Sequence, residues 1–224
     1  MTGIPLILLF VKYPEPGYIK TRLASCIGAD EAGELYRAFI LDILSTLKIA
    51  GFPFRICFYP EAKRALLLDW LGEEHHYVSQ RGESLGERMK NGFVDAFADG
   101  NERVIIIGSD SPDLPPSILR EAFDGLSIHD VVIGPSRDGG YYLIGFKKDT
   151  FLPSIFDNIP WSTPSVFSAT MAILHNSALD VYMLTEWNDI DTVDDIKQLI
   201  LRSSPGPFAR SKTMGLLSKM SLMK

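Results

Sequence analysis

Residues 103–115 read Arg-Val-Ile-Ile-Ile-Gly-Ser-Asp-Ser-Pro-Asp-Leu-Pro, an apolar run followed directly by two carboxylates. The apolar run is β-branched and does not alternate with polar residues, which is typical of a strand covered on both faces in a parallel sheet. Gly108 and Pro112 end the run, so Asp110 and Asp113 are expected on the loop at its carboxyl end. Open α/β sheets bind their ligands at that edge.

Two carboxylates on such a loop indicate a site for a hard divalent cation, Mg²⁺ or Mn²⁺, because these ions prefer oxygen ligands. The alternative is that one acid is a solvated turn residue and that the other caps the helix expected from Pro115. The other motifs of the chain favour the cation site.

The chain has 224 residues, enough for one well-buried α/β domain and too few for two ordinary ones. Its 46% hydrophobic and 22% charged residues indicate a soluble globular enzyme. The net charge of −6 argues against general nucleic-acid binding, although it allows a nucleotide ligand. The apolar run 4–11 is too short to span a membrane and lacks a basic flank, so we expect a cytoplasmic protein without a membrane span. Cys26 and Cys57 are too few for a metal cluster and are expected as buried, reduced thiols.

Strand-like and helix-like segments alternate along the chain. The alternation predicts a single-domain, three-layer α/β/α fold with a mostly parallel twisted sheet. Strands are expected at 4–11, 54–59, 77–79, 104–107, 130–134, 141–146 and 181–184. Helices are expected at 30–50, 61–71, 84–98, 115–123, 164–175 and 193–202. Ser84 with Glu87 forms a capping-box pattern at the start of one of these helices.

The predicted domain spans residues 1–202, and residues 203–224 differ from it in composition. This last segment contains four basic residues and no acid. The basic residues are Arg210, Lys212, Lys219 and Lys224. We expect a basic tail that packs on the body or on a partner subunit; a lid over an anionic ligand is the alternative.

The loop after the first expected strand combines rigidity with positive charge. Its turn-forming residues can direct backbone amides inward; they are Pro14, Pro16 and Gly17. Its cations are Lys12, Lys20 and Arg22. Such a loop suits a pyrophosphate, because amides and cations can share its negative charge. The loop matches neither the Walker A pattern nor the dinucleotide fingerprint. The alternative is a basic surface loop.

Two further stretches are candidate contacts for the base and the acceptor. Gln80 stands two positions before Gly82 and could present its amide to the edge of a nucleotide base. The alternative is that this stretch is an ordinary loop before a helix. Gly139 and Gly140 enter a strand, which marks close approach of the backbone to a ligand or simply a tight turn. Asp138 beside them could bind a sugar hydroxyl or act as a base.

The stretch from Trp187 to Thr192 carries two more acids. Asp189 and Asp191 alternate on an extended segment and therefore face the same side. Thr192 with Asp195 is expected to cap the following helix. Asp191 has no such structural role and is a further candidate metal ligand.

Several of these stretches also form an ordered set of motifs. The first motif is Phe10-x-Lys12-x-Pro14-x-Pro16-Gly17-x-x-Lys20-Thr21-Arg22-Leu23. The others are Gln80-x-Gly82-x-x-Leu85-Gly86, Gly108-Ser-Asp110-Ser-Pro-Asp113-Leu-Pro, Asp138-Gly-Gly-Tyr-Tyr142 and Asp189-Ile-Asp191-Thr. As a set they resemble the small bacterial glycosyltransferase-like proteins called rSAM/selenodomain-associated transferases. The matching motifs run from about residue 4 to residue 200.

That family is similar to the nucleotide-diphospho-sugar transferases of GT-A fold and to guanylyltransferases that make phospholactate-type precursors. The resemblance implies a nucleoside diphosphate or triphosphate against the loop 12–23, with Ser109 among the nucleotide-binding residues. Asp110 and Asp113 would correspond to the metal-binding acidic motif. They stand three positions apart, whereas the usual Asp-x-Asp places its acids two apart.

The resulting hypothesis is metal-dependent transfer of a sugar from a nucleotide-sugar to a small acceptor. Mg²⁺ or Mn²⁺ is assigned to Asp110 with Asp113 or Asp191. The diphosphate and base are assigned to residues of the loops; these are Lys12, Pro16, Gly17, Lys20, Arg22, Gln80, Gly82 and Ser109. The catalytic residues are Asp138 as the acceptor-side base with Lys20 and Arg22. The acceptor side is assigned to Gly139, Gly140, Tyr141 and Trp161.

Two other functions stay open. One is nucleotidyl transfer, in which a phosphorylated acceptor attacks a nucleoside triphosphate; the absence of Gly-x-Gly-Thr-Arg after the first strand favours the sugar. The other is a non-catalytic nucleotide-binding module. The sequence names neither the base, the sugar, the acceptor nor the stereochemical outcome, and it leaves a homo-oligomer open.

Overall fold

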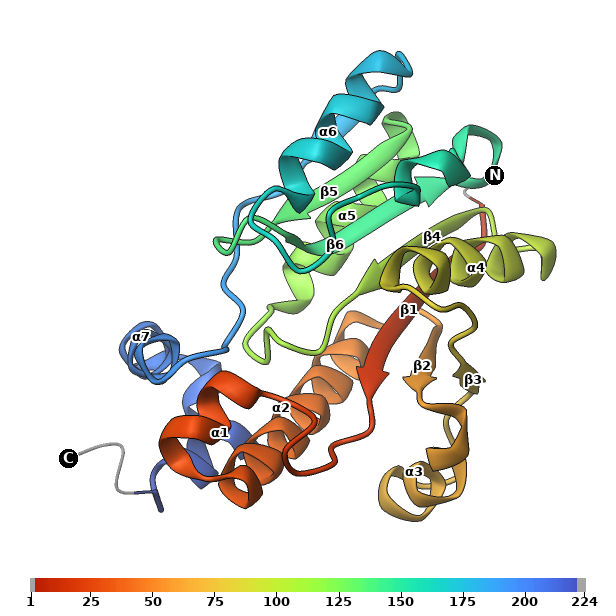
Figure 1. The fold of residues 1–224 in the computed structure, drawn as a ribbon. Coiled ribbons are helices and arrows are strands. Elements are labelled where there is room, and N and C mark those ends of the chain that lie inside the picture. Colours follow the sequence, from red (N-terminus) through yellow and green to blue (C-terminus); the bar gives the residue numbers. More distant parts are fainter. Residues whose placement is uncertain (1–2, 221–224) are drawn as a thin grey trace.

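Strand β4 (Arg103–Ile107), the apolar segment quoted first, lies in the middle of a sheet between β1 and β6 (Figure 1). The computed structural model describes residues 3–220. Seven strands of this part form one sheet in the order β3-β2-β1-β4-β6-β5-β7. The other strands are β1 (Pro5–Lys12), β2 (Phe54–Tyr59), β3 (Tyr77–Ser79), β5 (Val131–Pro135), β6 (Tyr141–Lys147) and β7 (Val181–Met183).

The sheet is mostly parallel, as predicted. Strand β1 pairs in parallel with β2 and β4, β2 with β3, and β5 with β7. Strand β6 runs antiparallel to both β4 and β5. The physical reason is the short connection 136–140 between β5 and β6, since a parallel pair needs a crossover of a dozen or more residues.

Helices cover both faces of the sheet and make the three layers. They are α1 (Thr21–Ile27), α2 (Ala29–Ala50), α3 (Arg64–Leu71), α4 (Leu85–Ala98), α5 (Pro116–Ile128), α6 (Val166–Asn176), α7 (Val193–Ser203) and α8 (Lys212–Leu217). Short 3₁₀ helices are η1 (Glu61–Lys63), η2 (Lys148–Thr150), η3 (Pro153–Phe156) and η4 (Pro207–Arg210). One core cluster joins the sheet to α2, α5, α7 and α8, and a second joins it to α4, η3 and α6.

Buried strand residues alternate between these two clusters. Ile7 and Leu9 of β1 belong to the first cluster, and Leu8 and Phe10 belong to the second. The alternation shows why the apolar runs do not alternate with polar residues: each face of the central strands is covered, so both kinds of position must be apolar.

Caps and boundaries follow the sequence closely. Strands β2 and β3 have the predicted bounds. The hydroxyl of Ser84 accepts a hydrogen bond from the backbone N–H of Glu87 at 3.1 Å and starts α4. Thr192 and Asp195 form a reciprocal capping box at the start of α7. The Thr192 box is confirmed in full, whereas only the Ser84 half of the other box forms, because the Glu87 carboxylate accepts the backbone N–H of Glu83 at 2.7 Å. Each cap satisfies an otherwise unpaired N–H group of a first turn.

Most other bounds differ from the prediction by one or two residues, and three differences are larger or change the type of element. The expected loop 12–23 ends in helix α1, which begins at Thr21. The expected helix at 61–71 begins as the 3₁₀ turn η1 before α3. Helix α5 continues past Phe123 to Ile128, because Leu126 in its last turns is fully buried against the sheet.

The described part of the C-terminal segment packs on the body of the protein. The carboxylate of Asp42 on α2 accepts the backbone N–H groups of Lys212 and Thr213, at 2.9 and 2.8 Å. Met214 and Leu217 of α8 are buried in the same core cluster as α2. Lys224 lies outside the described residues. Burial of α8 against α2 makes this helix a part of the core rather than a lid.

No helix among residues 3–220 has the length and apolar character of a membrane span. Cys57 is buried, as predicted, whereas Cys26 is exposed on α1, contrary to the prediction. The difference arises because α1 turns only Leu23 into the core.

Candidate active site

A cavity of about 680 Å³ lies at the edge of the sheet where the parallel strands end. Its size is within the range of small-molecule sites. In the order of the strands across the sheet, its lining includes Gln80, Tyr59, Lys12, Asp110, Tyr141, Asp138 and Asp189. Strand β6 contributes its first residues instead of its last because it runs antiparallel. The expected ligand edge therefore forms one continuous cavity.

Lys20 joins the basic loop to two acidic loops inside this cavity. Its Nζ lies 2.5 Å from Oδ1 of Asp110 and 2.8 Å from Oδ1 of Asp191. The Lys20 side chain is 3% exposed, whereas those of Asp110 and Asp191 are 45% and 38% exposed. The backbone of Lys20 is left-handed, with φ 47° and ψ 44°. Such a conformation is uncommon for a residue with a β-carbon and persists where the surrounding structure fixes it.

The surroundings of Lys20 keep it cationic. Burial works against its charge, but the carboxylates of Asp110 and Asp191 outweigh that effect and raise the pKa of Lys20 above its ordinary value. The ammonium also lies 6.0 Å from the ring centre of Tyr36 and 5.6 Å from that of Phe39. The two carboxylates therefore always face a positive charge.

A hydrogen-bond chain fixes the loop that bears Asp110. The hydroxyls of Tyr36 and Ser109 lie 2.6 Å apart, and the backbone N–H of Lys12 donates to the Tyr36 oxygen at 3.3 Å. Burial, together with the charge of Asp110, raises the pKa of Tyr36 to about 12, so this hydroxyl keeps its proton. The chain links α2, β1 and the loop after β4, which are distant in sequence.

The structure corrects the assignment of Asp113 as a metal ligand. Its carboxylate accepts hydrogen bonds from Nε and Nη2 of Arg202 at 2.6 and 3.0 Å, and from Nε1 of Trp187 at 3.2 Å. The side chain is 6% exposed and does not line the cavity. The carboxylate therefore faces Arg202 on α7 and not the cavity.

Asp189 takes the place in the cavity that the sequence analysis gave to Asp113. Its Oδ1 accepts a hydrogen bond from the hydroxyl of Ser111 at 2.7 Å. Burial, followed by the nearby charge of Asp110, raises the pKa of Asp189 to about 7. The alternation of Asp189 with Asp191 was the signal that could have identified it.

The acidic residues suit a cation that is shared with a ligand. Within residues 3–220 no three carboxylate, imidazole or thiol groups meet closely enough to enclose a metal ion. Mg²⁺ usually binds one or two carboxylates together with substrate phosphates and water. Asp110 and Asp191 fit that pattern, since the Lys20 ammonium already stands between them as a cation and each keeps a second oxygen.

At the other end of the cavity, Gln80 is fixed by the sheet. Its Nε2 donates to the backbone carbonyls of Cys57 and Val11 at 2.6 and 3.3 Å. With the donor occupied, the amide oxygen remains as an acceptor for a ligand. Gly82 does not line the cavity. A β-carbon there would meet Glu87 at 2.6 Å, so Gly82 is needed for helix packing.

Arg88, which was not predicted as a site residue, also lies in this region. The guanidinium lies 4.5 Å from the ring centre of Tyr59, and both side chains line the cavity. The side chain of Arg88 makes no hydrogen bond or ion pair with the residues described, and its Nε is buried without a partner. A partly buried cation without a carboxylate favours an anionic or carbonyl-bearing ligand.

The acceptor-side prediction places Asp138 on the loop after β5. Its Oδ1 accepts hydrogen bonds from the hydroxyl of Ser136 and from the backbone N–H of Gly140, the latter at 2.9 Å. Asp138 and Gly140 line the cavity, whereas Gly139 does not. A β-carbon on Gly139 would meet the carbonyl oxygen of Pro164 at 2.1 Å, so this glycine admits a close backbone approach.

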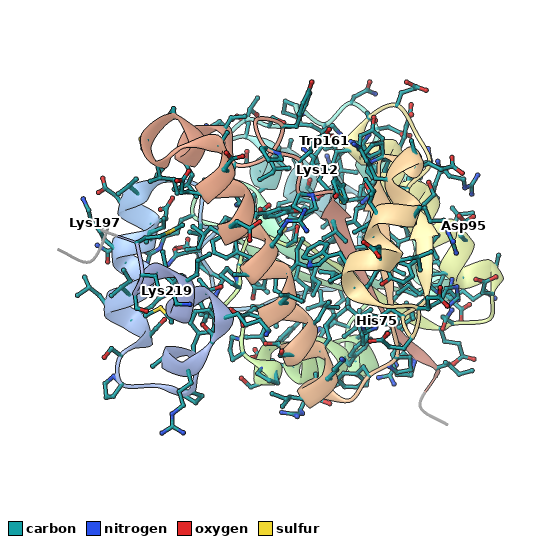
Figure 2. The ribbon with its side chains drawn as sticks, turned by 90° about the horizontal axis from the view of Figure 1, so that it is seen from below. Lys12, His75, Asp95, Trp161, Lys197 and Lys219 are labelled. Atoms are coloured by element: carbon teal, nitrogen blue, oxygen red, sulfur yellow. The ribbon has the colours of Figure 1, made fainter. Side chains whose placement is uncertain are left out.

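Aromatic rings complete this end of the cavity. The rings of Tyr141 and Trp161 meet edge to face with centres 6.4 Å apart, and both residues line the cavity. Figure 2 shows Trp161 and Lys12 in the same region of the molecule, away from Lys197 and Lys219.

The basic loop is brought together with the acids only in part. Lys12, Lys20 and Arg22 line the cavity, as do Ser109 and Asp110. Pro16 and Gly17 do not line it. They lie in the turn before Lys20, so their contribution is to the path of the loop.

Comparisons with known proteins agree with this fold. The model of a family described as "Uncharacterized protein conserved in bacteria (DUF2064)" matches residues 43–163. No curated protein matches the sequence significantly. A solved structure from Desulfovibrio desulfuricans G20, provisionally named a nucleotide-diphospho-sugar transferase, is 43% identical with a TM-score of 0.93. The match covers 96% of this chain and 94% of that one.

More distant structures share the fold alone. One is 4-diphosphocytidyl-2C-methyl-D-erythritol synthase from Anaerococcus prevotii DSM 20548, with 12% identity, 90% and 97% coverage of the two chains and a TM-score of 0.60. Another is CMP:2-keto-3-deoxy-manno-octonic acid synthetase complexed with CTP, with 12% identity, 89% and 99% coverage and a TM-score of 0.53. The seven-stranded α/β/α fold is thus that of the nucleotide-diphospho-sugar transferases, and the chain belongs to the DUF2064 family.

Proposed function

We propose that this protein is a glycosyltransferase that moves a sugar from a nucleotide-sugar donor to a small acceptor. The observation that supports this most directly is the contact of Lys20 with Asp110 and Asp191. It joins a cationic loop and a carboxylate edge in one cavity, where a diphosphate can lie between them.

The donor diphosphate is assigned to the cationic loop. Lys12 and Arg22 line the cavity and make no side-chain hydrogen bond or ion pair within the described chain, so both charges are available to a ligand. Lys20 supplies a third charge. Fixed cations stabilise the negative charge that grows on the leaving diphosphate in the transition state. The nucleotide base of the donor is assigned to the amide oxygen of Gln80, which accepts no hydrogen bond from the described residues, and Arg88 lines the same cavity.

Asp110 and Asp191 would hold a divalent cation, Mg²⁺ or Mn²⁺, together with phosphate oxygens of the donor. When bound, such an ion neutralises the diphosphate leaving group. Asp113 has no part in this assignment, since Arg202 occupies it.

Asp138 is the proposed acceptor-side base. The bond between the sugar anomeric carbon and the diphosphate oxygen breaks, the acceptor oxygen forms the new bond, and its proton passes to Asp138. A carboxylate accepts hydrogen bonds, so Asp138 matches a hydroxyl of a sugar or a polyol acceptor. Tyr141 and Trp161 give this end an apolar wall.

Nucleotidyl transfer is a second candidate, because the CTP complex and the diphosphocytidyl synthase share this fold. It would release pyrophosphate and needs a phosphorylated acceptor. The carboxylate of Asp138 favours a hydroxyl acceptor over a phosphate near it. The narrower family label of rSAM/selenodomain-associated transferase and a cytoplasmic location stay predictions.

The experiment is a thermal-shift screen of nucleotides and nucleotide-sugars with and without Mn²⁺, followed by product analysis. A ligand that binds the folded state raises its apparent stability. Release of nucleoside diphosphate from a nucleotide-sugar supports the proposal, and pyrophosphate from a triphosphate supports nucleotidyl transfer. Binding without turnover across donors and acceptors would instead indicate a nucleotide-binding module.

A further inference from the structure

We propose that Lys20 occupies the cation position between Asp110 and Asp191 in the ligand-free protein, so that a divalent cation binds there only together with a nucleoside diphosphate. The inference rests on the proposed function, because it concerns the same cavity. It adds that the binding of the metal ion depends on the binding of the diphosphate, and it gives Lys20 a role beyond contact with phosphate.

The geometry of the three side chains is that of an occupied cation site. One ammonium lies within 2.5 and 2.8 Å of one oxygen from each carboxylate. Its side chain is enclosed, at 3% exposure, while both carboxylates remain open to the cavity. An ion that entered between Asp110 and Asp191 would therefore meet a fixed positive charge at the point where the two carboxylates are shared.

Lys20 cannot yield this position without another anion. Its side chain lies beside the rings of Tyr36 and Phe39. If a metal ion bound both carboxylates in place of Lys20, the ammonium would stay buried without a partner, which is strongly unfavourable. The left-handed backbone of Lys20 and the hydrogen bond from the N–H of Ala24 to its carbonyl, at 2.8 Å, keep the side chain on this path.

A diphosphate removes the conflict. Its oxygens give Lys20 a new partner, and they also complete the coordination of a metal ion on Asp110 and Asp191. Metal and diphosphate then bind more tightly together than either does alone, and thermodynamic linkage requires each to raise the affinity of the other by the same factor.

The test measures Mn²⁺ binding by electron paramagnetic resonance with and without UDP or GDP, with the Mn²⁺–diphosphate complex recorded in protein-free samples. The wild-type protein should bind Mn²⁺ at least about tenfold more tightly when the diphosphate is present. Lys20→Met should bind Mn²⁺ alone about tenfold more tightly than the wild type, and the diphosphate should increase its Mn²⁺ affinity by a smaller factor than it does in the wild type.

A matched control is Lys63→Met. Lys63 pairs with Glu15 of the same loop at 3.0 Å, but it does not line the cavity. The substitution removes the same charge, so a general electrostatic effect would appear in both variants. Lys63→Met should bind Mn²⁺ as the wild type does.

Two results would overturn the inference. The first is wild-type protein that binds Mn²⁺ alone as tightly as Lys20→Met does; diphosphate binding measured by calorimetry would then leave the proposed function in place. The second is no Mn²⁺ binding with any diphosphate, which also removes the metal from the proposed function. Should Lys20→Met fail to fold, Lys20→Gln, which removes the charge and keeps a polar side chain, replaces it in the same measurements with the same expected result.

Discussion

Arg202 on α7 donates two hydrogen bonds, at 2.6 and 3.0 Å, to the carboxylate of Asp113, which follows β4. Trp187 donates a third to the same group. The contact joins the loop that bears Asp110 to the segment that bears Asp191. One acid of the motif after β4 therefore faces the ligand cavity, and the other holds the two acidic loops together.

Asp113→Ala is expected to destabilise the fold by about 2 kcal/mol, because it leaves a half-buried guanidinium without its partner. Urea denaturation measures the change. The control is Asp194→Ala on α7, which removes an exposed pair with Lys197 and should change the stability much less. A stable Asp113→Ala protein that cannot bind Mn²⁺ with a diphosphate would return Asp113 to the metal site.

Asp110→Asn is expected to lower turnover by about 10²-fold or more with little change in melting temperature. The amide keeps the shape of the side chain but loses the charge that faces Lys20 and the cavity. Steady-state kinetics with the active donor and a thermal melt measure both effects. Asp157→Asn, which alters a surface pair with Lys90 outside the cavity, is the control. A fully active Asp110→Asn enzyme would contradict the assignment.

Asp138→Asn is expected to lower turnover by about 10²- to 10⁴-fold, while the donor still binds. The amide oxygen can keep the hydrogen bond from the Gly140 N–H, so the loop should retain its shape. Kinetics measure turnover, and calorimetry measures donor affinity. If donor affinity fell by the same factor, the substitution would be disturbing the cavity, and the result would contradict the assignment of Asp138 as the general base.

Asp189→Asn is expected to stabilise the metal-free protein at pH 8 by at least about 1 kcal/mol and to have little effect at pH 4. The folded-state pKa of Asp189 is raised from 3.8 to about 7, so its ionisation is disfavoured by the fold. The cost is absent below pH 4, grows between pH 4 and 7, and is complete above pH 7. Denaturation in EDTA at several pH values measures it. A gain of the same size at every pH would point to another cause.

Gly86→Ala is expected to raise the KM for the acceptor by displacing Trp161. A β-carbon at Gly86 would lie 2.6 Å from Nε1 of Trp161 and 2.6 Å from the carbonyl oxygen of Phe156. Gly215→Ala in α8, where a β-carbon meets nothing within 4 Å, is the control. Kinetics with varied acceptor measure the effect. An unchanged KM would remove Trp161 from the acceptor side.

Local signals explain why much of the fold could be predicted. The apolar run of β4, the Ser84 cap and the Thr192 cap each depend on neighbouring residues, so they are visible in the sequence. Helix α1 escaped the prediction because it is short and turns only Leu23 into the core. The exposure of Cys26 has the same cause.

The site residues that could be predicted are likewise those whose position follows from local signals. Lys12, Lys20, Arg22 and Asp110 were expected at one sheet edge, since strand order and strand ends determine where they lie. Asp113 was predicted in the site and lies outside the cavity, whereas Asp189 was not assigned a role and lines the cavity. The difference arises because the partner of a side chain determines where that side chain points. Arg202, which occupies Asp113, is far away in sequence, and nothing local to Asp113 reveals it.

Local patterns in the amino-acid sequence were enough to predict the alternation of strands and helices, the edge of the sheet at which ligands are expected and the chemical character of the groups placed there. Which carboxylates face the cavity, and the position of Lys20 between two of them, became visible in the folded protein. The two kinds of feature depend on residues at different separations along the chain. Caps and apolar periodicity involve residues that are close in sequence, whereas ion pairs and burial depend on groups that meet only when the chain is folded.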